Sequence, residues 1–182
     1  MLVVFIYGPA ASGKHTVGSL VANQLDIPLF HNHLTVDLVG TLFDFGTGPF
    51  RRLRADIWRA SFRECAQADR SFVFTFHPEA TVDPDEIPDL IRIVEEAGGS
   101  LFFVELLCSR SAVLARLANE SRRRFGKLTD PGLYATIEAA GGFEFHGLPK
   151  PDLQIDTEIA NPEDAAAAIV AAVKTAGPTI LA

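Results

Sequence analysis

The stretch GPAASGKHT, which begins at Gly8 and ends at Thr16, carries the strongest structural signal in the sequence. It matches the phosphate-binding pattern G-x-x-x-x-G-K-[ST] at Gly8, Gly13 and Lys14. The next residue is His15 instead of a serine or threonine, and a threonine follows only one step later. The hydroxyl at that position of the pattern holds a magnesium ion. The stretch therefore predicts a phosphate-binding loop whose magnesium ligand has been replaced.

The surroundings of the loop fit phosphate binding. Residues 2–7, LVVFIY, form an apolar run that predicts a strand buried on both faces, and the apolar residues after Lys14 recur at helical spacing. Glycines allow successive N–H groups to point at an anion, the following helix adds its positive end, and the lysine adds a mobile charge. We therefore predict a nucleotide site. Its expected binding residues in the loop are Gly8, Ala11, Ser12, Gly13, Lys14, His15 and Thr16.

Strands and helices are expected to alternate along the whole chain. The predicted strands span residues 2–7, 27–31, 71–76, 100–108 and 152–157. The predicted helices span residues 14–25, 34–43, 50–68, 83–98, 109–120, 130–141 and 161–174. This order predicts an α/β fold with a five-stranded parallel sheet between two helical layers. Ligands of such sheets bind beyond the carboxyl ends of the strands, where Gly8, His31, His77 and Asp156 should gather.

Composition limits the classes of function. The chain has 182 residues, 48% of them apolar and 21% charged, which is typical of one soluble domain, here residues 1–182. The net charge of -7 argues against general nucleic-acid binding. No apolar run approaches the roughly 20 residues that cross a bilayer, and the first residues lack the features of a signal peptide. Cys65 and Cys108 lie in no paired motif, so we expect reduced thiols and a cytoplasmic location. No motif sets the oligomeric state.

The position of the loop, the short chain and the order of elements resemble the small-molecule P-loop kinases, such as shikimate kinase, chloramphenicol phosphotransferase and the nucleoside monophosphate kinases. The resemblance extends over almost the whole chain, although only the loop and a later basic stretch are motif-specific. The chain also resembles uncharacterised bacterial kinase-like proteins in which a non-hydroxyl residue and then a threonine follow the loop lysine. The resemblance implies a three-layer P-loop NTPase fold, ATP as the phosphate donor, Mg²⁺, a small-molecule acceptor and a mobile lid.

Two departures from the kinase pattern concern magnesium and the acceptor. Shikimate kinases carry a D-x-D pattern at the end of the second strand, where residues 30–37 of this chain read FHNHLTVD. Many P-loop proteins place an acidic residue at the end of the third strand, where this chain has Thr75 and His77. The resemblance therefore supports the donor better than the acceptor.

A basic stretch follows the fourth predicted strand. Residues 116–127 contain four arginines and one lysine against the single carboxylate of Glu120. By the resemblance, this region implies a lid near residues 120–131, in which arginines close over the phosphates and stabilise charge during transfer. The alternative is a solvated helix face. The lid residues proposed as catalytic are Arg122, Arg123 and Arg124, and Arg116 is proposed to bind the nucleotide.

The acceptor side contains candidates with two interpretations each. Asp37 lies where related kinases place acceptor-binding or base carboxylates, so we predict it to be catalytic together with Lys14; it could instead stabilise a helix start. Asp156 precedes a loop that resembles the adenine-packing region of the family. A second basic patch is either an acceptor site or plain surface; it comprises Arg51, Arg52 and Arg54.

His31 and His33 alternate at a strand end and could share one face, with His77 nearby. A zinc site needs a further ligand at a persuasive spacing, and the sequence offers none, so no metal-ligating residue is predicted. Two functions remain open. The first is an ATP-dependent phosphotransferase, which the lid arginines favour. The second is a nucleotide-binding regulatory or partner-binding protein without transfer chemistry, which His15 and the missing acidic residue favour.

Overall fold

The computed structural model describes residues 1–117 and 130–176. At its centre is a five-stranded sheet in the order β2-β3-β1-β4-β5, in which all adjacent strands are parallel. The strands are β1 (Leu2–Tyr7), β2 (Leu29–His31), β3 (Phe72–Phe76), β4 (Ser100–Leu107) and β5 (Leu153–Asp156). The predicted α/β class and the five-stranded parallel sheet are confirmed.

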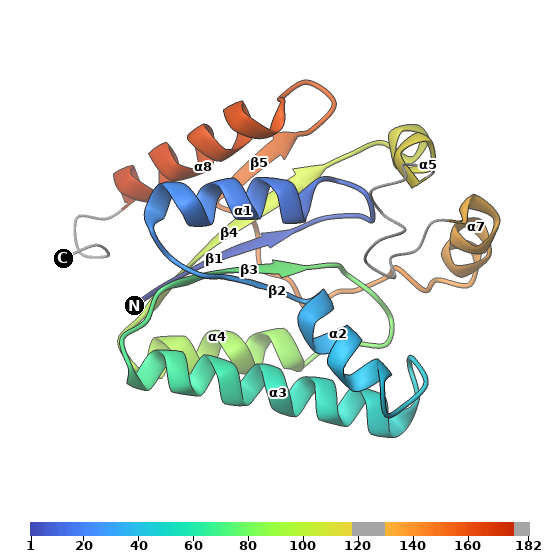
Figure 1. Ribbon diagram of the computed structural model, residues 1–182, viewed down its shortest axis with the longest axis horizontal. Coiled ribbons are helices and arrows are strands. Elements are labelled where there is room, and N and C mark those ends of the chain that lie inside the picture. The colour runs from blue at the N-terminus through green and yellow to red at the C-terminus, as the bar shows by residue number, and fades with distance from the viewer. Residues whose placement is uncertain (118–129, 177–182) are drawn as a thin grey trace.

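Helices cover both faces of the sheet and its carboxyl end (Figure 1). The helices α1 (Lys14–Leu25) and α8 (Pro162–Ala176) lie on one face, and α3 (Gly48–Gln67) and α4 (Glu86–Glu96) lie on the other. The shorter helices α2 (His33–Gly40), α5 (Arg110–Leu117) and α7 (Pro131–Ala139) lie toward the end at which the strand arrows point. The fold is thus a three-layer αβα sandwich with additional helices around the carboxyl ends of the strands. Ligands of open parallel sheets generally bind at that end.

The alternation of side chains along β1 builds a core on each face. Leu2, Val4 and Ile6 pack in the cluster that includes α1 and α8. Val3 and Phe5 pack in the opposite cluster, which is rich in aromatic rings from α3 and β3. Every residue of β1 is buried, as expected for the central strand of a parallel sheet with both faces covered.

Some strands and helices begin at residues other than those predicted, and nearby hydrogen bonds explain two of these differences. The second strand begins at Leu29 instead of residue 27, because the Ile27 N–H bonds back to the Ala22 carbonyl at the end of α1. His33 is the first residue of α2, so the expectation that His31 and His33 alternate along one strand is wrong. The fourth helix begins at Glu86 instead of residue 83, because the carboxylate of Asp83 accepts from the amide of Asp85 in a turn.

Two predicted helix starts are confirmed by their caps. Asp130 accepts from the amides of Gly132 and Leu133 at the head of α7. Asn161 accepts from the amide of Asp164 at the head of α8. In residues 1–117 and 130–176, no helix is long and apolar enough to cross a membrane.

Candidate nucleotide site

The loop between β1 and α1 has a backbone that requires glycine at its first position. Gly8 has a φ of 150°, and a Cβ atom there would lie 2.4 Å from the carbonyl oxygen of Leu106. Gly13 has a φ of 89°, and Ala11, although it has a side chain, has a φ of 59°. Positive φ values at three positions turn the chain back on itself between the strand and the helix. Nests of this kind point backbone N–H groups at anions.

Lys14 is folded back onto this loop. Its Nζ donates to the carbonyl oxygens of Gly8 at 2.9 Å and Pro9 at 2.6 Å, and lies 3.5 Å from Ser12 Oγ. These contacts hold the ammonium group against the loop backbone. A mobile ammonium with three donors can exchange a carbonyl for a phosphate oxygen without leaving the loop.

The first turn of α1 offers backbone N–H groups to an anion. The N-cap is Gly13, which has no side chain to accept from these groups, and the first turn contains no acidic residue. The first four N–H groups of a helix have no partner within the helix, and the helix dipole makes this end positive. Together with Lys14, the start of α1 is suited to hold phosphate groups.

His15, at the position of the usual hydroxyl, packs against His31 at the end of β2. Its ring lies 4.8 Å from the ring of His31, measured between centroids, at an interplanar angle of 78°. Thr16 is exposed. The ring of His33 lies 6.4 Å from that of His31. The structure therefore joins the first turn of α1 to the end of β2 through an edge-to-face imidazole pair.

His77 contacts the loop from the end of β3. Tyr7 and Phe76 are in register at the ends of β1 and β3, so Gly8 and His77 follow neighbouring strand ends. The Nδ1 atom of His77 lies 3.2 Å from the Gly8 carbonyl oxygen. A carbonyl oxygen can only accept, so this hydrogen bond requires Nδ1 to carry a proton. The predicted neighbourhood of Gly8 and His77 is thus present.

Asp37 lies on the exposed side of α2, together with Leu34 and Leu38, which are 51% and 57% exposed. Its carboxylate forms no hydrogen bond or ion pair with any residue in 1–117 or 130–176. It belongs to α2, which directly follows β2 and lies toward the carboxyl end of the sheet (Figure 1). The catalytic role of Asp37 stays a prediction.

Arg116 connects α5 to the segment that follows β5 through hydrogen bonds. Its Nη1 donates to Thr157 Oγ1 at 3.0 Å and its Nη2 to the Thr157 carbonyl at 2.6 Å. Asp156 accepts from the amide of Glu158 at 2.9 Å and so shapes the same loop. The structure brings these two predicted residues to one loop, although Asp156 lies on an edge strand, away from Gly8 and His77.

The remaining predicted residues, Arg122, Arg123 and Arg124, lie outside the described part of the chain, as does most of the expected lid near residues 120–131. Asp130 and Pro131 are described and begin α7.

A buried ion pair between α3 and the segment after β3 was missed by sequence reasoning. Arg54 is 1% exposed, and its Nη1 donates to Glu79 Oε1 at 2.5 Å. Burial lowers the pKa of Arg54 and raises the pKa of Glu79, because each charge is removed from water. A signal existed: Arg54 falls between Phe50 and Trp58 at four-residue spacing, on the buried stripe of α3.

No protein-family model matches the sequence, and no curated protein is significantly similar to it. The fold is similar to that of an unliganded sugar kinase from Janibacter sp. HTCC2649, with a TM-score of 0.66, 16% identity, and coverage of 96% of this chain and 95% of that chain. It is also similar to the APS kinase of Mycobacterium tuberculosis in complex with AMPPNP and APS, with a TM-score of 0.62, 18% identity, and coverage of 95% and 96%.

A shikimate kinase from Aquifex aeolicus is similar over 97% of this chain and 98% of its own, with a TM-score of 0.54 and 16% identity. These structures are P-loop small-molecule kinases, so the chain has the fold of that group, as the sequence predicted.

Proposed function

We propose that this protein is an ATP-dependent phosphotransferase that moves the γ-phosphate of ATP to a hydroxyl group of a small molecule. The observation that carries the proposal is the loop at Gly8 to Lys14, with its positive-φ glycines, its lysine against the loop carbonyls and the open start of α1. The fold it shares with small-molecule kinases supports the same conclusion.

The residues present fit the phosphates of a nucleotide. A side chain at position 8 would collide with the Leu106 carbonyl, so the close backbone turn depends on glycine. The amides at the start of α1 and the ammonium of Lys14 supply donors for phosphate oxygens. Arg116 and Asp156, which shape the loop after β5, would border the nucleotide base.

Transfer of the γ-phosphate requires groups that stabilise the negative charge on the phosphoryl oxygens. It also requires a group that accepts the proton of the acceptor hydroxyl. The acceptor oxygen forms a bond to the γ-phosphorus while the bond from that phosphorus to the β–γ bridging oxygen breaks, and ADP departs with the bonding electrons. The proton of the acceptor hydroxyl passes to Asp37, or to solvent. Lys14 and the arginines at 122–124 would stabilise the negative charge on the phosphoryl oxygens.

Asp37→Asn keeps the shape of the side chain and removes its charge. If Asp37 accepts the proton, turnover should fall by about 10²- to 10⁴-fold, with little change in ATP affinity. Steady-state kinetics with an identified acceptor will measure this. Asp44→Asn, at another exposed carboxylate near the end of α2, is the matched control and should keep wild-type turnover. If Asp37→Asn keeps activity near that of the wild type, Asp37 does not accept the proton and is only an exposed residue of α2.

Magnesium would have to be held differently from the usual P-loop arrangement. Among residues 1–117 and 130–176, no group of three or more His, Cys, Asp or Glu side chains could hold a metal ion. Mg²⁺ prefers oxygen ligands and keeps several waters. The ion would therefore be held mainly by phosphate oxygens and water, with His15 directed toward His31.

His15→Ser should restore a hydroxyl at this position. We expect wild-type ATP binding to be almost independent of magnesium, and the variant to bind ATP about tenfold more tightly with Mg²⁺ than with a chelator, which corresponds to about 1.4 kcal/mol. Calorimetric titrations with and without Mg²⁺ will compare them. His15→Ala, which removes the ring without adding a hydroxyl, is the control. A steep magnesium dependence already present in the wild type would contradict this account of the loop.

A nucleotide-binding regulatory protein is the second candidate. The imidazole pair of His15 and His31, and His77 in place of an acidic residue after β3, favour it, because both replace oxygen ligands. ATP consumption measured across sugars, shikimate, antibiotics and nucleosides separates the two functions. Consumption that depends on one class of acceptor supports the kinase, whereas binding without consumption supports the regulatory protein.

A further inference from the structure

The carbonyl oxygen of Gly8 accepts hydrogen bonds from two side chains at once. Lys14 donates to it from Nζ at 2.9 Å, and His77 donates from Nδ1 at 3.2 Å. A carbonyl oxygen has two lone pairs, so the two bonds do not compete for the same position. Gly8 itself is buried. The first glycine of the loop is therefore the point at which the loop lysine and the end of β3 meet.

The two donors are expected to behave differently when a nucleotide binds. Lys14 is the mobile charge of the loop, and it must turn toward phosphate oxygens to bind them. Turning away removes one of the two donors from the Gly8 carbonyl. A buried carbonyl without any donor costs free energy, and this cost would be subtracted from the affinity for the nucleotide. With His77 in place, the carbonyl keeps a donor after the lysine has moved.

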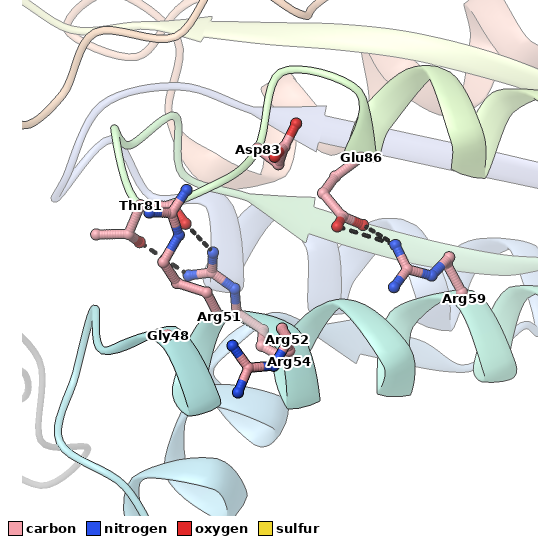
Figure 2. Close-up of a pocket in the computed structure, with 8 residues that line it drawn as sticks. All are labelled: Gly48, Arg51, Arg52, Arg54, Arg59, Thr81, Asp83 and Glu86. Atoms are coloured by element: carbon pink, nitrogen blue, oxygen red, sulfur yellow. Dashed lines mark hydrogen bonds and ion pairs between the residues drawn. The ribbon is translucent and has the colours of Figure 1, made fainter.

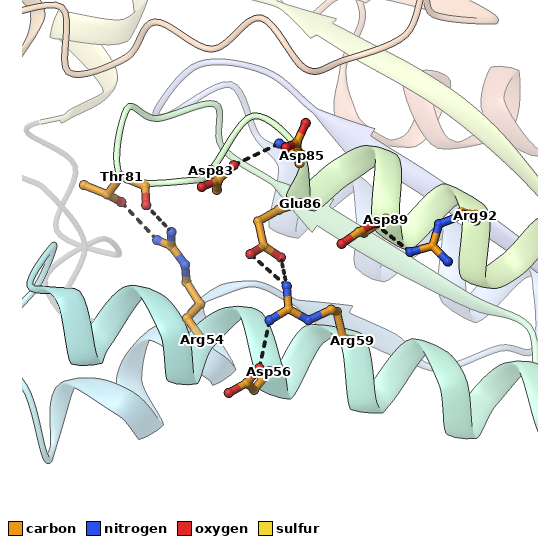
Figure 3. A network of polar contacts seen from close by, with 9 residues as sticks. All are labelled: Arg54, Asp56, Arg59, Thr81, Asp83, Asp85, Glu86, Asp89 and Arg92. Atoms are coloured by element: carbon orange, nitrogen blue, oxygen red, sulfur yellow. Dashed lines mark hydrogen bonds and ion pairs between the residues drawn. The ribbon is translucent and has the colours of Figure 1, made fainter.

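The backbone that carries His77 is held from two sides. His77 begins the segment that follows β3, and on one side Arg54 of α3 donates to the carbonyl of Thr81 in that segment at 2.8 Å (Figure 2, Figure 3). On the other side, the amide of Ala80 donates to the carbonyl of Gly142 at 2.9 Å, in the chain that follows α7. The segment is thus fixed both to α3 and to the chain after α7.

The ring of His77 is oriented by aromatic packing. The ring of Phe143 lies 5.2 Å from it, measured between centroids, at an interplanar angle of 53°. Phe143 in turn stacks on Tyr134 of α7, at 4.8 Å and 29°. Tyr134 is buried in a cluster that also contains Ala10 of the loop. These contacts limit rotation of the imidazole and keep Nδ1 directed at the Gly8 carbonyl.

The residue type matters at this position, because only a donor can serve the Gly8 carbonyl. An ionised carboxylate, which many P-loop proteins place after the third strand, only accepts hydrogen bonds. Histidine carries an N–H on Nδ1 in one of its neutral tautomers and in its charged form. The replacement of an acidic residue by His77 therefore exchanges an oxygen ligand for a hydrogen-bond donor to the loop.

We propose that His77 is a positioning residue of the nucleotide site. Its Nδ1–H holds the Gly8 carbonyl, so that Lys14 can move its contact from this carbonyl to a phosphate oxygen at little cost. The inference rests on the proposed function through the nucleotide site alone, because it concerns the binding step and no part of the transfer. His77 acts through Gly8 and Lys14, and its loss is expected to weaken nucleotide binding without unfolding the protein.

Two variants of similar size test this role. His77→Leu removes the donor, whereas His77→Asn places an amide N–H at the position of Nδ1. We expect His77→Leu to bind a non-hydrolysable ATP analogue about fivefold more weakly than the wild type, and His77→Asn to stay within about twofold of it. Calorimetry measures the affinities, and circular dichroism checks the fold. The control is His146→Leu, at an exposed histidine that forms no hydrogen bond with residues 1–117 or 130–176, and it should bind like the wild type.

The same substitution in a chain that lacks the lysine separates positioning from general stabilisation. In the Lys14→Ala background, His77→Leu should not weaken binding further, because no lysine has to leave the Gly8 carbonyl when the nucleotide binds. A residue that only stabilised the fold would lower the affinity by the same factor in both backgrounds. The difference between the two factors is the coupling between His77 and Lys14.

The proposal is overturned if His77→Leu binds like the wild type, if His77→Asn loses as much affinity as His77→Leu, or if the loss is equal in both backgrounds. ATP consumption is measured separately on the same proteins. The expected pattern of affinities without ATP consumption would remove the phosphotransferase but keep the role of His77. ATP consumption by the wild type together with unchanged affinity in His77→Leu would have the opposite meaning.

Discussion

Lys14→Ala should abolish phosphate transfer and weaken ATP binding by at least about a hundredfold, because each lost charge-assisted hydrogen bond contributes about 1.5–3 kcal/mol. The lysine contacts the Gly8 and Pro9 carbonyls, and the amino group is the loop's mobile charge for the outer phosphates. Calorimetry with an ATP analogue that resists hydrolysis gives the affinity without an acceptor. Circular dichroism checks that the fold is retained.

The control for this variant is Lys174→Ala, which removes an exposed lysine from the last turn of α8. It should bind ATP like the wild type, because it lies at the opposite end of the sheet from the loop (Figure 1). Unchanged ATP affinity in Lys14→Ala would exclude the loop as the nucleotide site.

Glu79→Gln should destabilise the protein by about 3–5 kcal/mol, because it leaves the buried guanidinium of Arg54 without its counter-charge. The loss is expected in urea unfolding as a lower midpoint with an unchanged slope. The pair joins α3 to the segment after β3, where Arg54 also donates to Thr81 (Figure 3).

A double-mutant cycle separates the interaction energy of Arg54 with Glu79 from the contribution that each residue makes to stability on its own. Arg54→Met/Glu79→Gln should be less destabilised than the sum of the two single variants, because neither charge is then left unpaired in the interior. Glu86→Gln, whose partner Arg59 is more exposed than Arg54, should cost less. Additive effects of Arg54→Met and Glu79→Gln would contradict a coupled buried pair.

The parts of the fold that follow from local patterns could be predicted. The caps at Asp130 and Asn161 depend on neighbours within a few positions. The apolar run at residues 2–7 and the glycine pattern of the loop are recognisable in the local sequence, although the structure shows that distant segments pack against both. The start of α4 was predicted too early because Asp83, a good cap by type, bonds instead within its own turn.

Contacts between distant segments could not be predicted. Arg54 and Glu79 are 25 residues apart, and Arg116 and Thr157 are 41 apart, and nothing in either local sequence indicates its partner. The edge-to-face pair of His15 and His31 depends on how closely α1 packs against β2, which residue type alone does not determine. The arginines at 122–124 lie outside the described residues, and their role over the phosphates stays a prediction.

The central claim is that the protein transfers the γ-phosphate of ATP, and a single-turnover experiment with γ-labelled ATP tests it directly. The protein is mixed with a smaller amount of the labelled ATP in a buffer that contains Mg²⁺. The reaction is run with and without a mixture of neutral and acidic hydroxylated compounds. We predict that label leaves ATP slowly to water as inorganic phosphate, and faster when one of the compounds serves as acceptor, and that Lys14→Ala stops both. ATP that binds tightly to the wild type but keeps all of its label over hours, with and without the compounds, would contradict the account.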